Sequence, residues 1–152
     1  MKTPLSALSV LVVTLLVAPG CRSSELVAPN APEPIAVSVQ DRTAPEGERV
    51  PKIYVSASAG SVAVRVTRGA LCGTRVNAAV NRGAGEVDVV SHVSANPSLL
   101  CAPTPARAVV DYTGTVSSLA AGRYRIRVFE GVGDGAPRFI GSAFVTVPRP
   151  AA

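Results

Sequence analysis

Apolar and polar residues alternate along most of the chain between residues 35 and 147. In the segment VAVRVTR, for example, Val62, Val64 and Val66 fall on one face and Arg65 falls on the other. A repeat of two residues belongs to a β-strand, whereas an amphipathic helix needs apolar residues three and four positions apart. No helical repeat longer than two turns follows residue 34, so the alternation predicts an all-β domain.

Turn residues divide this stretch into about eight short strands. The expected strands are 35–40, 52–59, 62–68, 74–80, 86–93, 106–116, 123–130 and 139–147. Many short strands at this spacing are typical of an antiparallel sandwich or barrel. We predict one domain over 35–148, an antiparallel β-sandwich of about 7–8 strands, followed by a frayed tail at 149–152. The last strand carries apolar residues on both faces, and Gly141 is the expected place for a bulge.

The alternation also assigns the two faces of the central strands. Residues on the inner face are expected to be buried: Val62, Val64, Val66, Tyr124, Ile126 and Val128. Residues on the outer face are expected to reach solvent: Arg65, Arg123, Arg125 and Arg127. A shift of one residue in register would exchange these two sets.

One stretch narrows the kind of sandwich. The segment LAAGRYRIRV resembles the strand entry that carries the tyrosine corner in immunoglobulin-like and fibronectin-type-III-like domains. The resemblance lies in Leu119, Gly122 and Tyr124, followed by apolar Ile126 and Val128. It implies an immunoglobulin-like sandwich in which the Tyr124 hydroxyl bonds the backbone a few residues upstream. It implies nothing about function, because this scaffold hosts many functions.

The N-terminus has the order of an export signal. Lys2 gives a positive start, and no charge occurs from Thr3 to Gly20. The apolar run is about 14 residues long, which suits a signal peptide and is shorter than the ~20 residues of a membrane-spanning helix. Small residues stand at Ala18 and Gly20, the positions that matter for cleavage. Residues 1–20 are therefore predicted to be a signal peptide.

The end of this signal, VAPGC, resembles the box of bacterial lipoprotein precursors. The match lies at Gly20 and Cys21, whereas Ala18 and Pro19 depart from the usual residues. The resemblance implies that Cys21 becomes the mature N-terminus and carries fatty acids such as palmitate. The membrane would then be a partner through this lipid. The alternative is ordinary cleavage before Cys21, which would release a soluble protein.

Residues 21–34 would form a lipidated, proline-rich tether. Pro29, Pro32 and Pro34 hold the chain extended and remove backbone donors, so no packed element is expected there. Such a tether would reach about 40 Å at ~3.1 Å per residue. Arg22, rather than Asp, follows the cysteine; by the same resemblance this favours the outer membrane, with the domain facing the periplasm or the cell surface.

The chain contains three cysteines, and an odd number is unfavourable in an oxidising compartment unless one is used. If Cys21 carries the lipid, Cys72 and Cys101 remain as a pair. We predict a disulfide between them, which would stabilise the fold by roughly 3–4 kcal/mol in the chain-entropy account. Two cysteines and His92, without C-x-x-C spacing, fall short of a metal site, so neither a metal nor another cofactor is expected.

The net charge of +5 comes from 15 basic and 10 acidic residues. The basic residues are scattered, without the clustering and aromatics of a nucleic-acid binder, so we expect no nucleic-acid partner. Arg123, Arg125 and Arg127 share one strand face. They would form either a solvated outer face, with arginine stems covering apolar surface, or a face for an anionic ligand or lipid headgroup. Their mutual repulsion favours carboxylate partners on neighbouring strands.

Catalytic patterns are lacking in the sequence. His92 is the single histidine; Asp88, on the same strand, would lie ~13 Å away, and Asp111 could reach it only through folding. No G-x-S-x-G or phosphate-binding loop occurs. Asp134 lies in the glycine-rich segment 131–137, which is expected to be a hairpin loop. We therefore predict that the protein is not an enzyme.

Three function hypotheses follow. The first is a non-catalytic binding or accessory module held on the envelope by a lipid, with an envelope protein or glycan as partner. The second is a structural envelope protein without a specific ligand. The third is a secreted protease-inhibitor-like sandwich that would present the proline-rich loop 94–106. The sequence leaves the oligomeric state open.

Overall fold

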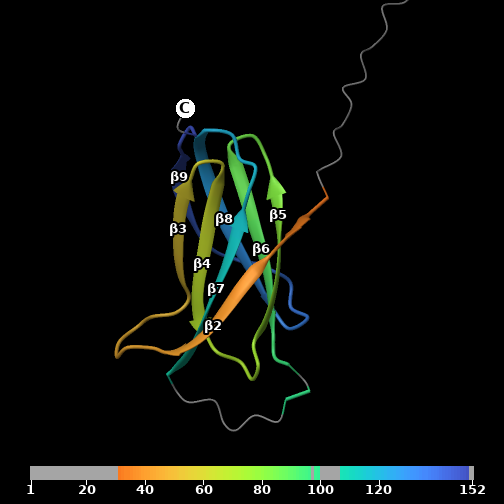
Figure 1. Cartoon of the computed structure of the whole chain (residues 1–152). Helices are drawn as coiled ribbons and strands as arrows, with labels where there is room; N and C mark the ends of the chain where they lie inside the picture. The colour runs from red at the N-terminus through yellow and green to blue at the C-terminus, as the bar shows by residue number, and fades with distance from the viewer. Residues whose placement is uncertain (1–30, 97, 100–106, 151–152) are drawn as a thin grey trace, which may run out of the picture.

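The computed structural model of the protein describes residues 31–96, 98–99 and 107–150, which contain nine strands and no helix (Figure 1). The strands are β1 (Glu33–Ile35), β2 (Val37–Thr43), β3 (Lys52–Ser58), β4 (Ser61–Gly69), β5 (Arg75–Arg82), β6 (Glu86–Ser94), β7 (Ala108–Val116), β8 (Gly122–Val132) and β9 (Arg138–Val147). The predicted all-β class is confirmed.

The strands form two sheets packed face to face, with a valine-rich core between them (Figure 1). One sheet has five strands in the order β1-β5-β6-β8-β9, and the other has four in the order β2-β7-β4-β3. All neighbouring strands are antiparallel except β6 and β8, which are parallel. This pair is parallel because β7, which lies between them in the chain, belongs to the other sheet.

The segment expected to be one strand at 35–40 is two strands in two sheets. β1 pairs with β5 and β2 pairs with β7, and the chain passes between the sheets at Ala36. The alternation runs unchanged through the crossing, so it could not reveal the change of sheet. β1 also begins inside the stretch expected to be a free tether. Pro34 fits there because β1 is an edge strand, where a missing N–H breaks no ladder.

The predicted core faces are confirmed except at Tyr124. Val62, Val64, Val66, Ile126 and Val128 are buried. Tyr124, by contrast, is only half-buried. Its hydroxyl donates a hydrogen bond to the carbonyl oxygen of Ala120, at 3.0 Å, as the resemblance to a tyrosine corner implied. The ring therefore marks the end of the core, where strand β8 begins.

A polar cluster links the two sheets inside the sandwich; Arg68, Ser91, Tyr112 and Glu130 form this interior cluster. The Tyr112 hydroxyl donates to a Glu130 carboxylate oxygen at 2.7 Å and lies 2.8 Å from Oγ of Ser91. Arg68 pairs with the other Glu130 oxygen at 3.1 Å. Burial and the Glu130 carboxylate outweigh the hydrogen bond with Ser91 and raise the pKa of Tyr112 above its usual value. No buried side-chain polar atom of the described residues lacks a hydrogen-bond partner.

Candidate functional site

The three arginines of β8 lie on the outer face of the five-stranded sheet, as the alternation predicts. Arg123 and Arg125 are exposed, and Arg127 is partly buried. The register of β6 against β8 places Asp88 opposite Arg127 and Glu86 opposite Arg125. Arg127 donates two hydrogen bonds to Asp88, at 2.6 and 2.7 Å, while Arg125 lies 3.8 Å from Glu86. The expected carboxylate partners on a neighbouring strand are therefore present.

Arg123 has a different partner from its two neighbours. Its guanidinium carbon lies 4.8 Å from the ring centroid of Phe144 on β9, within the range of a cation–π contact. No ion pair of Arg123 occurs among the residues that the structure describes. Of the three arginines, this one therefore keeps its charge uncompensated on that surface, above an exposed aromatic ring.

A bulge in β9 gathers the phenylalanines on the same face. Val128 lies opposite Gly141, but Phe129 lies opposite Phe139, so Ile140 is the extra residue. Without the bulge, Phe139 and Phe144 would face opposite sides of the sheet, because they are five positions apart. With it, both point outward while Ile140 packs against the core. The bulge is located beside Gly141, as expected from the sequence.

The resulting surface, which we term the aromatic–arginine face, consists of Arg123, Arg125, Arg127, Phe129, Phe139 and Phe144. The chain has only three phenylalanines and no tryptophan, and all three phenylalanines lie on this face. Phe139 is 56% exposed and Phe144 is 64% exposed. Phe139 meets the ring of Phe129 edge-on at 5.7 Å. This concentration of exposed aromatic rings beside arginines is typical of a recognition surface.

Sequence reasoning found the arginines of this face and missed the phenylalanines. Strict alternation cannot place both Phe139 and Phe144 outside, because the bulge changes the alternation between them. A usable signal was present in Gly141. A Cβ at this position would lie 2.7 Å from Cδ1 of Ile53 on β3, so a larger residue here would have to displace the end of the Ile53 side chain where the two sheets pack together.

The same outer face has a shallow apolar hollow of about 390 Å³ at its other side, over β1, β5 and β6. Pro32, Pro34, Ala79 and Val90 form much of its lining, and His92 stands at its rim. His92 also lies against Gly131, where a Cβ would come within 2.9 Å of the ring. The histidine thus covers a glycine of the neighbouring strand and faces solvent.

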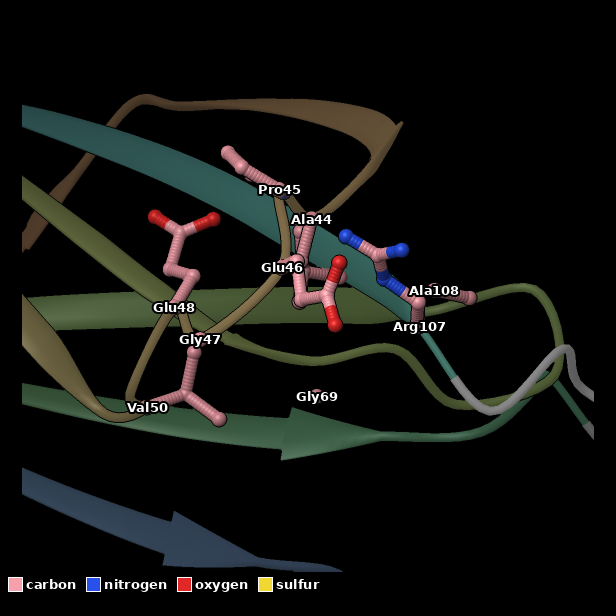
Figure 2. A pocket seen from close by; sticks show the side chains of 10 residues that line it. Ala44, Pro45, Glu46, Gly47, Glu48, Val50, Gly69, Arg107 and Ala108 are labelled. Carbon is pink, nitrogen blue, oxygen red and sulfur yellow. The ribbon is translucent and has the colours of Figure 1, made fainter.

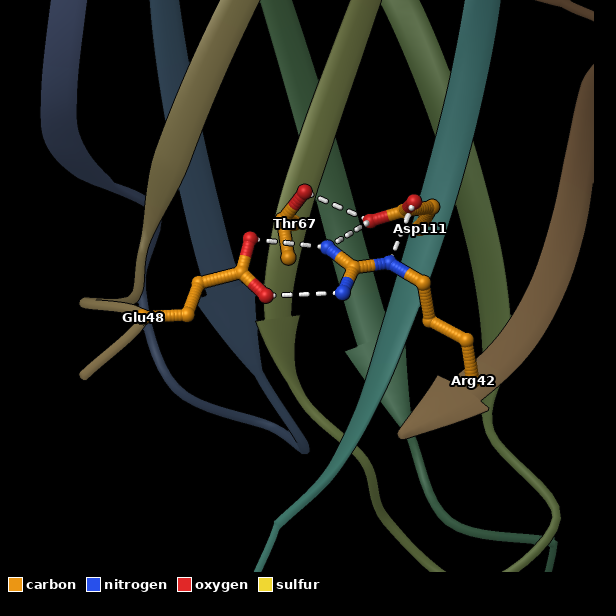
Figure 3. Close-up of polar contacts among 4 residues, drawn as sticks. All are labelled: Arg42, Glu48, Thr67 and Asp111. Carbon is orange, nitrogen blue, oxygen red and sulfur yellow. Dashed lines mark hydrogen bonds and ion pairs between the residues drawn. The ribbon is translucent and has the colours of Figure 1, made fainter. Parts of the chain in front are cut away.

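On the opposite sheet, Arg42, Glu48, Thr67 and Asp111 form a cluster that we term the loop clamp. Figure 3 shows Arg42 of β2 reaching between Glu48 and Asp111, with hydrogen bonds of 2.7 to 2.9 Å to Glu48 and 2.9 Å to Asp111. Thr67 donates to the same Asp111 carboxylate. Because Glu48 lies in the connection between β2 and β3, the clamp holds this connection against the sheet.

A second hollow, of about 340 Å³, lies where segment 44–50 passes the ends of β4 and β7 (Figure 2). Glu46 and Arg107 stand on its rim, and Figure 2 shows the Glu48 carboxylate turned away from both. Glu48 belongs to the loop clamp, so it is not available to a ligand in this hollow. The described lining offers no set of groups that points to one.

The fold does not pair His92 with either of the aspartates considered as its catalytic partners. Asp88 is bound to Arg127 and Asp111 is bound to Arg42, on opposite sheets. His92 is exposed on the five-stranded sheet. Asp134 is exposed in the hairpin loop between β8 and β9, at the expected place. Within the described residues, no three histidine, cysteine, aspartate or glutamate side chains gather closely enough to hold a metal.

Several predicted features lie outside the described residues: Cys21, the signal peptide, most of the tether, Cys101 and most of the loop 94–106. Cys72 lies between β4 and β5. Its carbonyl accepts a hydrogen bond from the Asn96 amide at 2.8 Å, and its sulfur lies 3.5 Å from the Leu99 carbonyl oxygen. Cys72 thus stands beside the start of the segment that contains Cys101, and the disulfide stays a prediction.

Comparison with protein-family models, curated proteins and solved structures found no match to this chain. The described residues include no helix long and apolar enough to cross a membrane. The case for function therefore rests on the surface itself.

Proposed function

We propose that this protein is a non-catalytic binding module of the cell envelope and that it recognises a partner through the aromatic–arginine face. The observation that carries the proposal is the exposure of Phe139 and Phe144, 56% and 64%, in a chain with only three phenylalanines. Exposed aromatics beside arginine are enriched where proteins bind one another, because both supply large contact area. A solvated structural face would not need these rings.

The partner is an envelope protein or glycan. A protein partner would cover the rings with apolar side chains, and a glycan would stack a sugar ring on Phe144 beside Arg123. Arg125 and Arg127 are already paired with Glu86 and Asp88, so they set the shape of the surface more than its charge. Arg123 supplies the charge that a ligand can use.

A lipid on Cys21 holds the module at the membrane. Metabolic labelling of the protein with a clickable fatty acid tests this lipidation. The wild-type chain should be labelled and the Cys21→Ser variant should not. Equal labelling of both would reject lipidation and favour a secreted soluble protein.

A Cys72–Cys101 disulfide closes the domain. Mass spectrometry of unreduced peptides should recover the linked pair, and free thiols at both positions would reject the disulfide.

The sandwich is of the immunoglobulin-like type. This is supported by the Tyr124 hydroxyl bond to Ala120, which is the contact of a tyrosine corner. An experimental structure tests it: a strand order that differs from immunoglobulin-like sandwiches would reject the type while leaving the all-β class untouched.

Binding through the face is tested by photo-crosslinking of the full-length protein in cells. The double variant Phe139→Ser, Phe144→Ser should lose the crosslinked partner, because it removes the exposed rings without touching the core. Tyr54→Ser is the matched control, since Tyr54 is the exposed aromatic of the opposite sheet, 39% exposed. A double variant that captures the partner as well as wild type would overturn the proposal.

A further inference from the structure

Strand β9 forms an edge of the five-stranded sheet, and most of its length lacks the features that protect edges. From Phe139 to Val147 the chain carries no charge and no proline. The other edges differ: β1 has three residues and contains Pro34, β2 contains Asp41 and Arg42, and β3 begins with Lys52. Short strands, prolines and charges all discourage pairing with another chain. Strand β9 begins with the charge of Arg138 and carries the bulge at Ile140, but both lie at its beginning and leave Gly141 to Val147 without such a feature.

The register identifies the backbone groups that face this open edge. The Arg125 amide donates to Gly85 beyond β6, at 2.9 Å, so it points away from β9. Arg125 lies opposite Phe144. In an antiparallel pair, opposed residues either bond each other or both point away. Phe144 therefore directs its N–H and C=O outward, and Ser142 and Thr146, two positions on either side, do the same.

The charge above this edge is basic. The guanidinium of Arg123 extends over Phe144 at 4.8 Å from the ring centroid, which brings it from β8 to the row of β9. A strand added beyond β9 would lie about 4.8 Å further out. An acidic side chain on that strand would therefore come within reach of Arg123, and an apolar one would cover Phe144.

We propose that an extended, acidic segment of a partner protein binds as an added strand along β9, with a carboxylate on Arg123. This inference rests on the proposed function and names how its partner binds. Backbone bonds to Ser142, Phe144 and Thr146 supply the affinity, and Arg123 with Phe144 selects the side chains. A second copy of the chain fits less well. Two β9 strands paired across a two-fold axis would bring both Arg123–Phe144 pairs together, and the like charges would repel.

The test uses fluorescent synthetic peptides as long as β9, 10 residues, made of valine and threonine with a single glutamate near the centre, so that the carboxylate and apolar side chains can share one face of the added strand. Matching peptides carry lysine in place of glutamate. The glutamate peptide should bind the wild-type protein, and the lysine peptide should bind at least about tenfold more weakly, the effect of losing one charge-assisted bond. Amide NMR signals of Ser142, Phe144 and Thr146 should shift on binding. Equal binding of both peptides would overturn the proposal.

Proline at the edge gives the sharpest variant. Ser142→Pro removes an outward N–H without breaking the ladder to β8, so the fold is kept while strand addition is blocked. Ser142→Ala is the matched control, since it keeps the N–H. Thr146→Pro repeats the test if Ser142→Pro fails to fold. Full peptide binding by a folded proline variant would reject the proposal, as would wild-type dimerisation that the proline abolishes.

The same variants separate this inference from the proposed function. In the cellular crosslinking assay, loss of the partner with Phe139→Ser, Phe144→Ser but not with Ser142→Pro would keep the binding face and reject strand addition. Loss with Ser142→Pro alone would keep strand addition and reject the face. Loss with both is the expected result.

Discussion

The outer faces of the two sheets carry similar residue types and arrange them differently. On the four-stranded sheet, Arg42 is held by Glu48 and Asp111, and Tyr54 lies under the cations of Lys52 and Arg65. The connection from β2 to β3 folds back onto this face, and Thr67 beneath it is only 1% exposed. The arginine and carboxylates of this face therefore fasten the chain to itself.

Among the residues that the structure describes, no connection of this kind covers β8 and β9 of the five-stranded sheet. Its Asp88 and Glu86 pair with arginines of the adjacent strand on the same outer face. Phe139 and Phe144 stay exposed, and Arg123 lies on Phe144 rather than on a carboxylate. In this domain, the loop that crosses one sheet makes its arginine and aromatic residues part of a closed surface, and the sheet without such a loop leaves them open for a partner.

The largest effect should come from the interior cluster, in which an arginine and a carboxylate are mostly enclosed between the two sheets. Glu130→Ala leaves Arg68 and the Tyr112 hydroxyl without their carboxylate between the sheets. We expect a loss of roughly 3–5 kcal/mol in the free energy of unfolding, measured by urea denaturation. Glu130→Gln is the control, because it keeps an acceptor for Tyr112. A loss no larger than that of a clamp variant would contradict the expectation.

The loop clamp should come next. Asp111→Ala removes the acceptor of the buried Thr67 hydroxyl and one of the two carboxylates of Arg42. We expect a loss of about 1–3 kcal/mol, the cost of an unsatisfied buried hydroxyl. Asp88→Ala on the opposite face should cost less, because the partly solvated pair with Arg127 contributes little. Equal losses would mean that the two faces are held in the same way.

Acid should weaken the loop clamp as well. Burial raises the pKa of Asp111, but the hydrogen bonds from Arg42 and Thr67 outweigh it and lower the pKa below its usual value. The hydrogen bond from Arg42 also lowers the pKa of Glu48. A lowered pKa in the folded state stabilises the fold above the usual pKa of about 4, and this contribution is lost as pH falls.

The denaturant concentration at which the wild type is half unfolded should therefore decrease as the pH is lowered from about 5 to 3. Asp111→Asn should flatten this dependence, because it removes one of the two carboxylates whose pKa is lowered. Chemical denaturation at a series of pH values measures both. A profile unchanged by Asp111→Asn would show that the clamp does not titrate in this range.

The smallest effect on stability is expected at the binding face. Phe144→Ser should change the free energy of unfolding by no more than about 0.5 kcal/mol, as for other exposed positions. Its effect should appear in partner capture instead. A marked loss of stability would mean that Phe144 is part of the structure rather than of a binding surface.

The strands with strict alternation could be predicted from the sequence. In the central parts of β4 and β8 every second residue is apolar, and the buried and exposed sets fell where expected except at the half-buried Tyr124. The passage from one sheet to the other at Ala36 could not be predicted, because alternation does not encode which sheet a strand joins. Only part of the candidate site could be predicted. Arg123, Arg125 and Arg127 share a face because they lie two positions apart in one strand, whereas Phe139 joins them only through the bulge.

That bulge divides strand β9 into two parts in which the inward and outward positions alternate with opposite parity. Beyond Gly141 the strand keeps the parity that packs Val145 and Val147 inward, and before Ile140 it has the opposite parity. A single added residue has thus converted a position that would face the core into one that faces the outside, with the ladder to β8 intact on both sides. Evolution can therefore vary the aromatic at residue 139 without any compensating change among the valines. The surface of this small domain can acquire new recognition while its interior stays fixed.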